Sequence, residues 1–260
     1  MKALIAGGAA AVLLGTSALA ADMAVKAPPL PPASPWTGYY IGVIAGGAWG
    51  TFDPRTSTVE VPGGEINPPS IAAINAAGAQ KINATSAIGG LEAGYNWQPG
   101  PYLFGLEADI EWLHLSGVAT TGAVPLVGGG GTFSVTSAAN IDWLATARGR
   151  LGYVAANNWL FYVTGGAAFT TLRGNFTFSE TISNVAETAA ISKAVVGYTV
   201  GGGVEVPLSR QWSIKAEYLF VDFAKVSASG TLPTPIPTYP VSHTLDLKLN
   251  IARLGANYHF

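Results

Sequence analysis

The sequence predicts an all-β protein that folds as an eight-stranded antiparallel up-and-down transmembrane β-barrel. Aromatic residues recur in pairs ten residues apart, and short turns alternate with long connections along the chain. Charged residues make up only 11% of the chain, and the mean hydropathy is +0.34. After the first twenty residues, however, no apolar run approaches the roughly 18 residues that a spanning helix needs. High hydropathy distributed over alternating residues is typical of a membrane barrel.

The aromatic pairs mark the expected membrane boundaries. They are Tyr39 and Trp49, Tyr102 and Trp112, Trp143 and Tyr153, and Trp159 and Phe169. An even spacing places both members of a pair on the same face of a strand. At roughly 3.3 Å per residue and a tilt of roughly 40°, ten residues rise about 25 Å, the height of the apolar band of an outer-membrane barrel. We therefore predict two aromatic rings, one at each membrane interface.

The N-terminal segment is expected to direct export. It contains Lys2, a short apolar stretch and the small residues Ala18 and Ala20, which is typical of a secretory signal peptide over residues 1–20 with its cleavage site. An N-terminal membrane anchor is the alternative. Residues 21–36 carry five prolines and are predicted to form an extended periplasmic lead-in. The barrel domain is then expected to span residues 37–260.

Clusters of Pro, Gly and Asn divide that domain into strands. We predict strands at residues 37–50, 84–97, 102–114, 138–154, 159–173, 193–206, 212–225 and 244–260. Three of the connections are tight turns. The long connections are 51–83, 115–137, 174–192 and 226–243, and these are predicted to be extracellular loops. Short periplasmic turns and an even number of strands then place both termini in the periplasm.

Alternate residues of each predicted strand face the barrel interior, and the charged residues occupy mainly these inward-facing positions. A buried unpaired charge costs several kcal/mol, so these residues are expected to pair with one another. Glu107 should neighbour Arg148, Glu217 should neighbour Arg253, and Lys215 and Arg150 can serve Glu92. An eight-stranded barrel is only wide enough to hold its own side chains, so we predict a polar plug, with a narrow gated pore as the alternative. The predicted network is Glu92, Glu107, Arg148, Arg150, Lys215, Glu217 and Arg253.

Two features test the rule that alternate residues of a strand face inward and outward. Asp142 is assigned to the inward face of its strand. On the last strand, Asp246, Lys248 and Asn250 have the opposite parity to Arg253. The last strand therefore requires either a bulge or an upper half outside the membrane.

Candidate catalytic residues are few. The chain has no cysteine, which excludes thiol nucleophiles, disulfides and cysteine metal sites. The residues expected near the extracellular rim are His114, His243, Asp109, Glu111 and Asp142. They leave a rim-sited hydrolase as an alternative. His114, however, is expected on the lipid-facing side of its strand, and His259 on the inward side at the periplasmic rim. The three histidines are far apart in the sequence and do not have the spacing of metal ligands. We expect no enzymatic activity, no cofactor and no metal.

The two ends of the mature chain resemble a known family. The segments are Trp36-Thr37-Gly38-Tyr39-Tyr40-Ile41-Gly42 and Arg253-Leu254-Gly255-Ala256-Asn257-Tyr258-His259-Phe260. They are similar to the first and last strands of the outer-membrane immunogenic proteins of alphaproteobacteria, which share the architecture of the OmpA transmembrane domain. The resemblance implies a structural or surface-exposed role in the outer membrane of a Gram-negative bacterium, sometimes with haem or host binding. It also implies that the barrel-assembly machinery reads Tyr258 and Phe260.

The expected partners follow from the location and the charge. Outer-membrane lipid and lipopolysaccharide should surround the barrel wall. The net charge is −2 and the sequence pI is about 5.9, so the chain offers no basic patch for nucleic acid. The oligomeric state does not follow from the sequence.

Overall fold

The computed structural model describes residues 36–64, 66–128, 130–182, 184–232 and 239–260. The predicted signal peptide with Ala18 and Ala20 lies outside the described residues, as does the Pro-rich lead-in except for Trp36. Among the residues described, no helix has the length and apolar character needed to cross a membrane.

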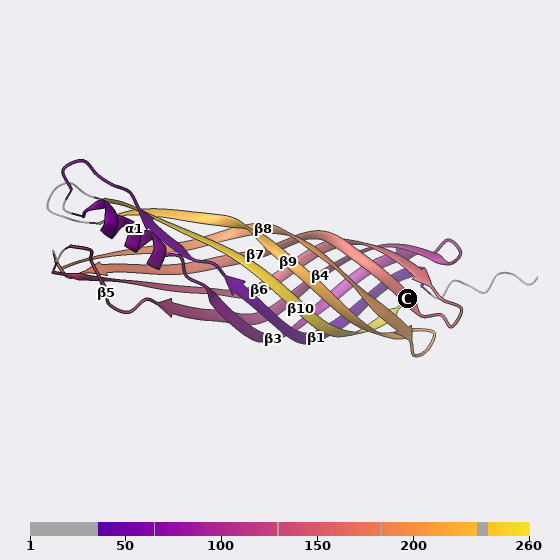
Figure 1. Ribbon diagram of the computed structural model, residues 1–260. Helices are drawn as coiled ribbons and strands as arrows, with labels where there is room; N and C mark the ends of the chain where they lie inside the picture. Colours follow the sequence, from indigo (N-terminus) through magenta and orange to yellow (C-terminus); the bar gives the residue numbers. More distant parts are fainter. Residues whose placement is uncertain (1–35, 65, 129, 183, 233–238) are drawn as a thin grey trace, which may run out of the picture. The chain divides into compact units, whose positions relative to one another are not determined.

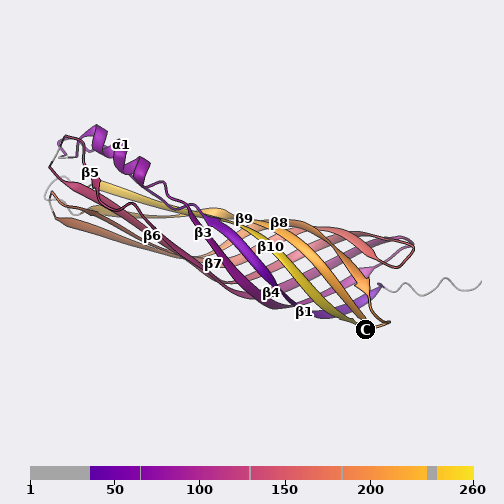
Figure 2. The same cartoon turned by 60° about the horizontal axis from the view of Figure 1, so that its bottom comes forward.

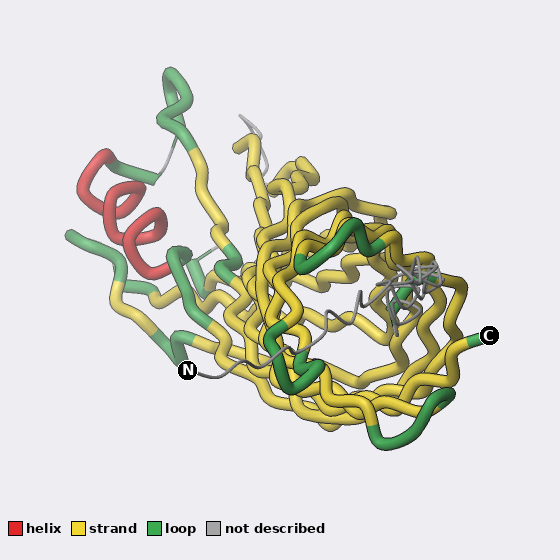
Figure 3. Tube along the Cα trace, turned by 90° about the vertical axis from the view of Figure 1, so that its right-hand side faces the viewer, coloured by secondary structure: helices red, strands yellow, loops and turns green. Residues whose placement is uncertain are grey.

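In the described part of the chain, eight long antiparallel strands close into a ring, which Figures 1 and 2 show from two directions. They are β1 (Gly38–Phe52), β3 (Ile82–Trp97), β4 (Tyr102–Thr120), β6 (Thr132–Val154), β7 (Leu160–Glu180), β8 (Val185–Pro207), β9 (Trp212–Leu232) and β10 (Tyr239–His259). Each pairs with the next, and β10 pairs back with β1. The end view in Figure 3 shows the strands arranged as a ring. The predicted fold class is confirmed.

The two ends of the ring differ. The three tight turns lie at one end together with the C-terminus, where the Phe260 amide donates a hydrogen bond to the Tyr39 carbonyl (3.1 Å). We call this the turn end and the opposite end the loop end. Three short elements belong to the loop end: β2 (Arg55–Thr58), α1 (Pro68–Ala77) and β5 (Val124–Pro125).

Aromatic side chains stand on the outer face at two levels, as the even spacing predicts. Tyr102 is register partner to Tyr153 near the turn end, and Trp112 is partner to Trp143 ten residues further along β4. Tyr102 and Trp112 are 59% and 55% exposed. Between the two levels the exposed residues of β4 are apolar: Phe104, Leu106, Ala108 and Ile110. An apolar outer band bordered by aromatic rings is the wall expected of a barrel in a lipid bilayer.

At the loop end, the strands continue well beyond the predicted membrane band. The segments 115–137, 174–192 and 226–243 were predicted as loops. That prediction is wrong for most of their described residues, because β4, β6, β7, β8, β9 and β10 all extend into these segments. The extended parts alternate buried apolar residues, such as Phe133 and Val135 or Phe176 and Phe178, with Ser and Thr. Their Gly, Ser and Thr content concealed this period-two pattern.

The extension consists of two sheets rather than a closed ring. Pairing of β3 with β4 ends at Ile88 opposite Leu113, and pairing of β8 with β9 ends at Gly197 opposite Phe223. Beyond these points β4, β6, β7 and β8 form one sheet. The other sheet consists of β9, β10 and β2 together with the ends of β1 and β3. A shared apolar core lies between them, with α1 packed against it through Ile74. Asn67 caps α1 by accepting a hydrogen bond from the Ser70 amide (2.9 Å), and Pro68 and Pro69 open its first turn.

A bulge near the loop-end aromatic ring corrects one parity assignment. The pairing of β4 with β6 shifts between Trp112 and Leu115, so that two residues of β4 lie opposite Asp142 alone. Asp142 therefore faces outward, whereas the sequence assigned it to the lumen, and its side chain is 39% exposed.

The last strand keeps one parity throughout. Leu247, Leu249 and Ile251 are buried in the same inward series as Arg253, so Asp246, Lys248 and Asn250 face outward. Asn250 is register partner to both Trp49 and Phe220, which places Lys248 and Asp246 beyond the aromatic ring. Of the two predicted solutions, the structure has the upper half outside the membrane band. The bulge nearby lies in β9, opposite Asp246.

Candidate functional site

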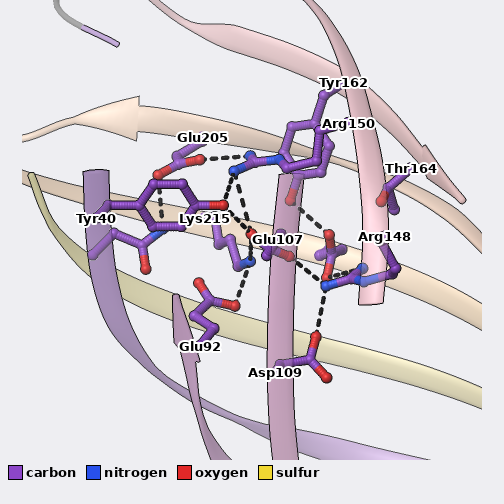
Figure 4. A network of polar contacts seen from close by, with 12 residues as sticks. Tyr40, Glu92, Glu107, Asp109, Arg148, Arg150, Tyr162, Thr164, Glu205 and Lys215 are labelled. Atoms are coloured by element: carbon purple, nitrogen blue, oxygen red, sulfur yellow. Dashed lines mark hydrogen bonds and ion pairs between the residues drawn. The ribbon is translucent and has the colours of Figure 1, made fainter. Parts of the chain in front are cut away.

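The barrel interior contains one connected set of buried charges, part of which is shown in Figure 4. The strands bring them together because alternate residues of neighbouring strands point to the same side of the wall. All seven residues of the predicted network lie in this set and are almost completely buried. Asp109, Glu111 and Glu205 also belong to the set, although the predicted network did not include them. Tyr40 and Tyr162 were missed altogether.

Glu107 is the centre of the network. It is register partner to Arg148 and forms an ion pair with that residue. It also accepts hydrogen bonds from the Tyr40 hydroxyl (2.6 Å), Lys215 Nζ (3.0 Å) and Arg150 Nη1 (3.3 Å). A single carboxylate on β4 thus joins groups from β1, β6 and β9.

Arg253 is the second branching point. It is register partner to Glu217, and the two side chains approach to 2.5 Å. Arg253 Nη2 also lies 2.9 Å from Asp109 Oδ2, and Nη1 contacts Glu111. Because Asp109 and Glu111 come from β4 and Arg253 from β10, these ion pairs cross the lumen.

The remaining charges extend the network toward the turn end. Lys215 binds Glu92 (2.5 Å), as the sequence predicts. Arg150 was assigned to the same carboxylate, but the structure pairs it with Glu205 (2.7 Å) and places its guanidinium 4.0 Å from the centre of the Tyr162 ring. That cation–π contact and the burial of Arg150 fix the side chain in one direction.

Tyr40 reaches the network because the strand beside it offers a gap. A Cβ on Gly94 of β3 would stand 2.4 Å from the Tyr40 hydroxyl. Glycine at this position therefore allows the ring to lie against the wall. The doublet Tyr39-Tyr40 was the available signal, since adjacent residues of a strand face opposite sides and one of the two had to point inward.

The network holds more acids than bases. Among the described residues at this level, six carboxyl groups face four permanent cations. The carboxyl groups are Glu92, Glu107, Asp109, Glu111, Glu205 and Glu217, and the cations are Arg148, Arg150, Lys215 and Arg253. One oxygen each of Asp109 and Glu111 has no hydrogen-bond partner. No group of three potential metal ligands occurs in the described chain.

Apolar layers lie on both sides of the network. Toward the turn end, Trp36 packs with Leu103, Val154 and Leu160, and its indole donates a hydrogen bond to the Asn158 carbonyl (3.2 Å). Toward the loop end, a larger cluster fills the ring. Its fully buried members are Phe52, Leu115, Ile141, Leu144, Ala168, Leu172, Leu219, Val221, Leu245, Leu247, Leu249 and Ile251. The sequence predicts the polar layer but not these two apolar layers.

The residues predicted near the rim do not form one site. Asp109 and Glu111 belong to the lumen network, and His114 points outward, with 74% of its side chain exposed. His243 is fully buried between the two sheets of the extension, where it contacts Glu187 (3.1 Å) and Thr56 (2.9 Å) and stacks on Phe176. Burial holds the pKa of His243 below its ordinary value, although Glu187 opposes this.

The C-terminal residues face outward at the turn end. Tyr258 packs edge-on against both Trp212 and Phe260, with 5.3 Å between ring centres in each case. Phe260 is 75% exposed. Recognition of Tyr258 and Phe260 by the barrel-assembly machinery remains a prediction.

The closed ring, its aromatic-bordered apolar wall and its filled interior define an integral outer-membrane β-barrel protein. The chain matches the model of the outer membrane protein beta-barrel domain over residues 8–260, and it belongs to that family.

Relatives agree with this membership. The chain is 32% identical to the 31 kDa outer-membrane immunogenic protein of Brucella melitensis, with both chains covered completely. It is 29% identical to a 22 kDa outer membrane protein of Rhizobium leguminosarum, over 75% of this chain and 68% of the other. The predicted resemblance to the outer-membrane immunogenic proteins is confirmed. The structure is also similar to OprG from Pseudomonas aeruginosa, at 11% identity and a TM-score of 0.39, covering 86% of this chain and 97% of OprG.

The surplus of carboxyl groups predicts unequal effects of two similar substitutions. Glu107→Gln removes the one carboxylate that contacts Arg148, Arg150 and Lys215 together, and should lower the free energy of unfolding by about 3–5 kcal/mol. Glu92→Gln removes a surplus charge and should cost about 1 kcal/mol or less, since Lys215 keeps Glu107 as its counter-charge. Urea unfolding in lipid vesicles, followed by gel mobility with and without boiling, measures both. The exposed Glu60→Gln is the matched control, and equal costs at positions 92 and 107 would contradict the charge balance.

Proposed function

We propose that this outer-membrane protein is a sealed barrel with a structural, surface-exposed role in the cell envelope. The observation that carries the proposal is the stacking of three filled layers across the lumen: Trp36 and its neighbours, the ion network, and the large apolar cluster. In this proposal the wall anchors the protein, and the two-sheet extension presents its surface to the environment.

A narrow gated channel is the competing function. Conduction would require a path through buried Arg148, Arg150 and Arg253, each held by at least two partners. It would also require water in a segment lined by leucine and isoleucine. Both changes disrupt packing over several strands at once, which supports the sealed barrel.

We further propose that the turn end faces the periplasm and the loop end faces outward. Short turns on the periplasmic side and long elements outside are the usual arrangement in outer-membrane barrels. Both termini would then lie in the periplasm. The apolar wall would contact outer-membrane lipid and lipopolysaccharide, and Tyr258 and Phe260 would be accessible to the barrel-assembly machinery from the periplasmic side.

The sealed lumen predicts an electrically silent protein. Purified, folded protein inserted into planar lipid bilayers should give no reproducible conductance steps under applied voltage. A folded sample is recognised by its faster migration on an unboiled gel. Discrete steps of constant size would overturn the sealed barrel in favour of the gated channel.

The orientation can be tested with single cysteines, since the chain has none of its own. Ser57→Cys lies on exposed β2 at the loop end, and Arg210→Cys lies in an exposed turn at the turn end. A membrane-impermeant maleimide should label the cysteine at position 57 on intact cells and the cysteine at position 210 only after lysis. The reverse pattern would contradict the proposed orientation, and labelling of both after lysis serves as the control for reactivity.

A further inference from the structure

Three side chains on the outer face of the barrel form a chain of hydrogen bonds from serine to histidine to aspartate. Ser116 Oγ lies 3.2 Å from His114 Nε2, and His114 Nδ1 lies 2.9 Å from Asp142 Oδ1. These distances are those of a nucleophile, a general base and the acid that orients the base. Such a triad is recognised by geometry and roles, whatever the order of its members in the sequence.

The local fold explains how the three residues meet. His114 and Ser116 are two residues apart on β4, so both point to the outer face. The bulge between Trp112 and Leu115 turns Asp142 of β6 outward, opposite His114. The parity rule, applied without the bulge, separates Asp142 from His114 by the barrel wall.

Asp142 is held in place from the other side. Arg173 of β7 forms an ion pair with it, and Asn140 donates a hydrogen bond to it (3.3 Å). The hydrogen bond with His114, together with Arg173, holds the pKa of Asp142 below its ordinary value. An ionised Asp142 accepts the Nδ1 proton of His114, which leaves Nε2 free to accept the hydroxyl proton of Ser116.

The surroundings indicate the kind of substrate. Trp112 precedes His114 by two residues on the same face of β4, and Trp143 adjoins Asp142. These two indoles are register partners in the loop-end aromatic ring, directly on the membrane side of the three residues. In the orientation proposed above, this ring lies at the outer-leaflet interface, where the ester bonds of membrane lipids are found.

We propose that Ser116, His114 and Asp142 form a hydrolytic site for carboxylic esters of lipid acyl chains at the outer-leaflet interface. This activity goes beyond the structural role and departs from the sequence-based expectation of no enzyme. Ser116 and His114 are its catalytic residues, and Asp142 is a positioning residue.

The reaction uses only these groups and water. Ser116 Oγ bonds to the ester carbonyl carbon while its proton passes to His114 Nε2. The bond from that carbon to the alcohol oxygen then breaks, and the alcohol leaves with the proton from His114. Water, deprotonated by His114, attacks the acyl-serine and releases the fatty acid, which restores the Ser116 hydroxyl.

The test measures fatty-acid release from phosphatidylethanolamine in mixed detergent micelles by folded full-length protein. Labelling with a fluorophosphonate, located by peptide mass, is the second readout. Wild type should release fatty acid and take the label on Ser116. Ser116→Ala and His114→Ala should each lower kcat about 1000-fold or more and abolish labelling. Asp142→Asn should lower kcat at least about 100-fold with little change in KM, because it alters the tautomer of His114 rather than lipid contact.

The matched control is Ser229→Ala, which removes another exposed serine of the extension and should retain the wild-type rate and label. All variants should keep the gel shift of a folded barrel, since the changed side chains face outward. If a variant does not fold, labelling of Ser116 in the wild-type protein decides whether the proposal stands. Absence of that label, or a wild-type rate in folded Ser116→Ala, would overturn the proposal. Because the lumen takes no part, either outcome leaves the sealed-barrel function to its own conductance test.

Discussion

The structure depends on how a narrow closed barrel accommodates charge. Eight strands leave room inside only for side chains, and strand alternation sends every second residue there. An ion in that space has lost its water and is stable only beside an opposite charge. Glu107 and Arg253 meet this requirement because each contacts several oppositely charged side chains, from strands on different sides of the ring. The same contacts tie those strands to one another.

In the proposed function, the position of the ion network within the lumen helps to seal the barrel. The ion network lies between apolar layers, with Trp36 on one side and the leucine-rich cluster on the other. The polar contacts fix the orientation of the buried side chains, because Arg150 and Lys215 can pair with carboxylates in few geometries. The apolar layers exclude water. The loop-end core continues this filling into the two-sheet extension, where Phe133 stacks on Phe178. Beyond the ring, therefore, the protein is stabilised as a soluble sandwich would be.

The features that follow local rules could be predicted from the sequence. Two-residue periodicity placed the charged residues inside and the aromatic residues outside. Register between consecutive strands was enough to pair Glu107 with Arg148 and Glu217 with Arg253. These predictions needed no knowledge of distant contacts, because sequential strands are neighbours in an up-and-down barrel.

The features that the sequence did not predict depend on long-range geometry. A bulge of one residue turned Asp142 to the outer face, and nothing local marks it. The partner of Arg150 is Glu205, which lies two strands away on β8, and this pairing depends on how the strands are staggered around the ring. The extension was missed because Ser, Thr and Gly dilute its alternation, although Phe176 and Phe178 preserve it.

The most direct test of interdependent buried charges is a double-mutant cycle on Glu217 and Arg253, measured by urea unfolding in lipid vesicles. Arg253→Met should be the more destabilising change, because it removes the cation that Glu217, Asp109 and Glu111 share, whereas after Glu217→Gln Arg253 keeps Asp109 and Glu111. The double variant should be more stable than the sum of the single effects implies, with a coupling of about 1–3 kcal/mol. Effects that add to within about 0.5 kcal/mol would show that the two side chains do not depend on each other, and would contradict this account.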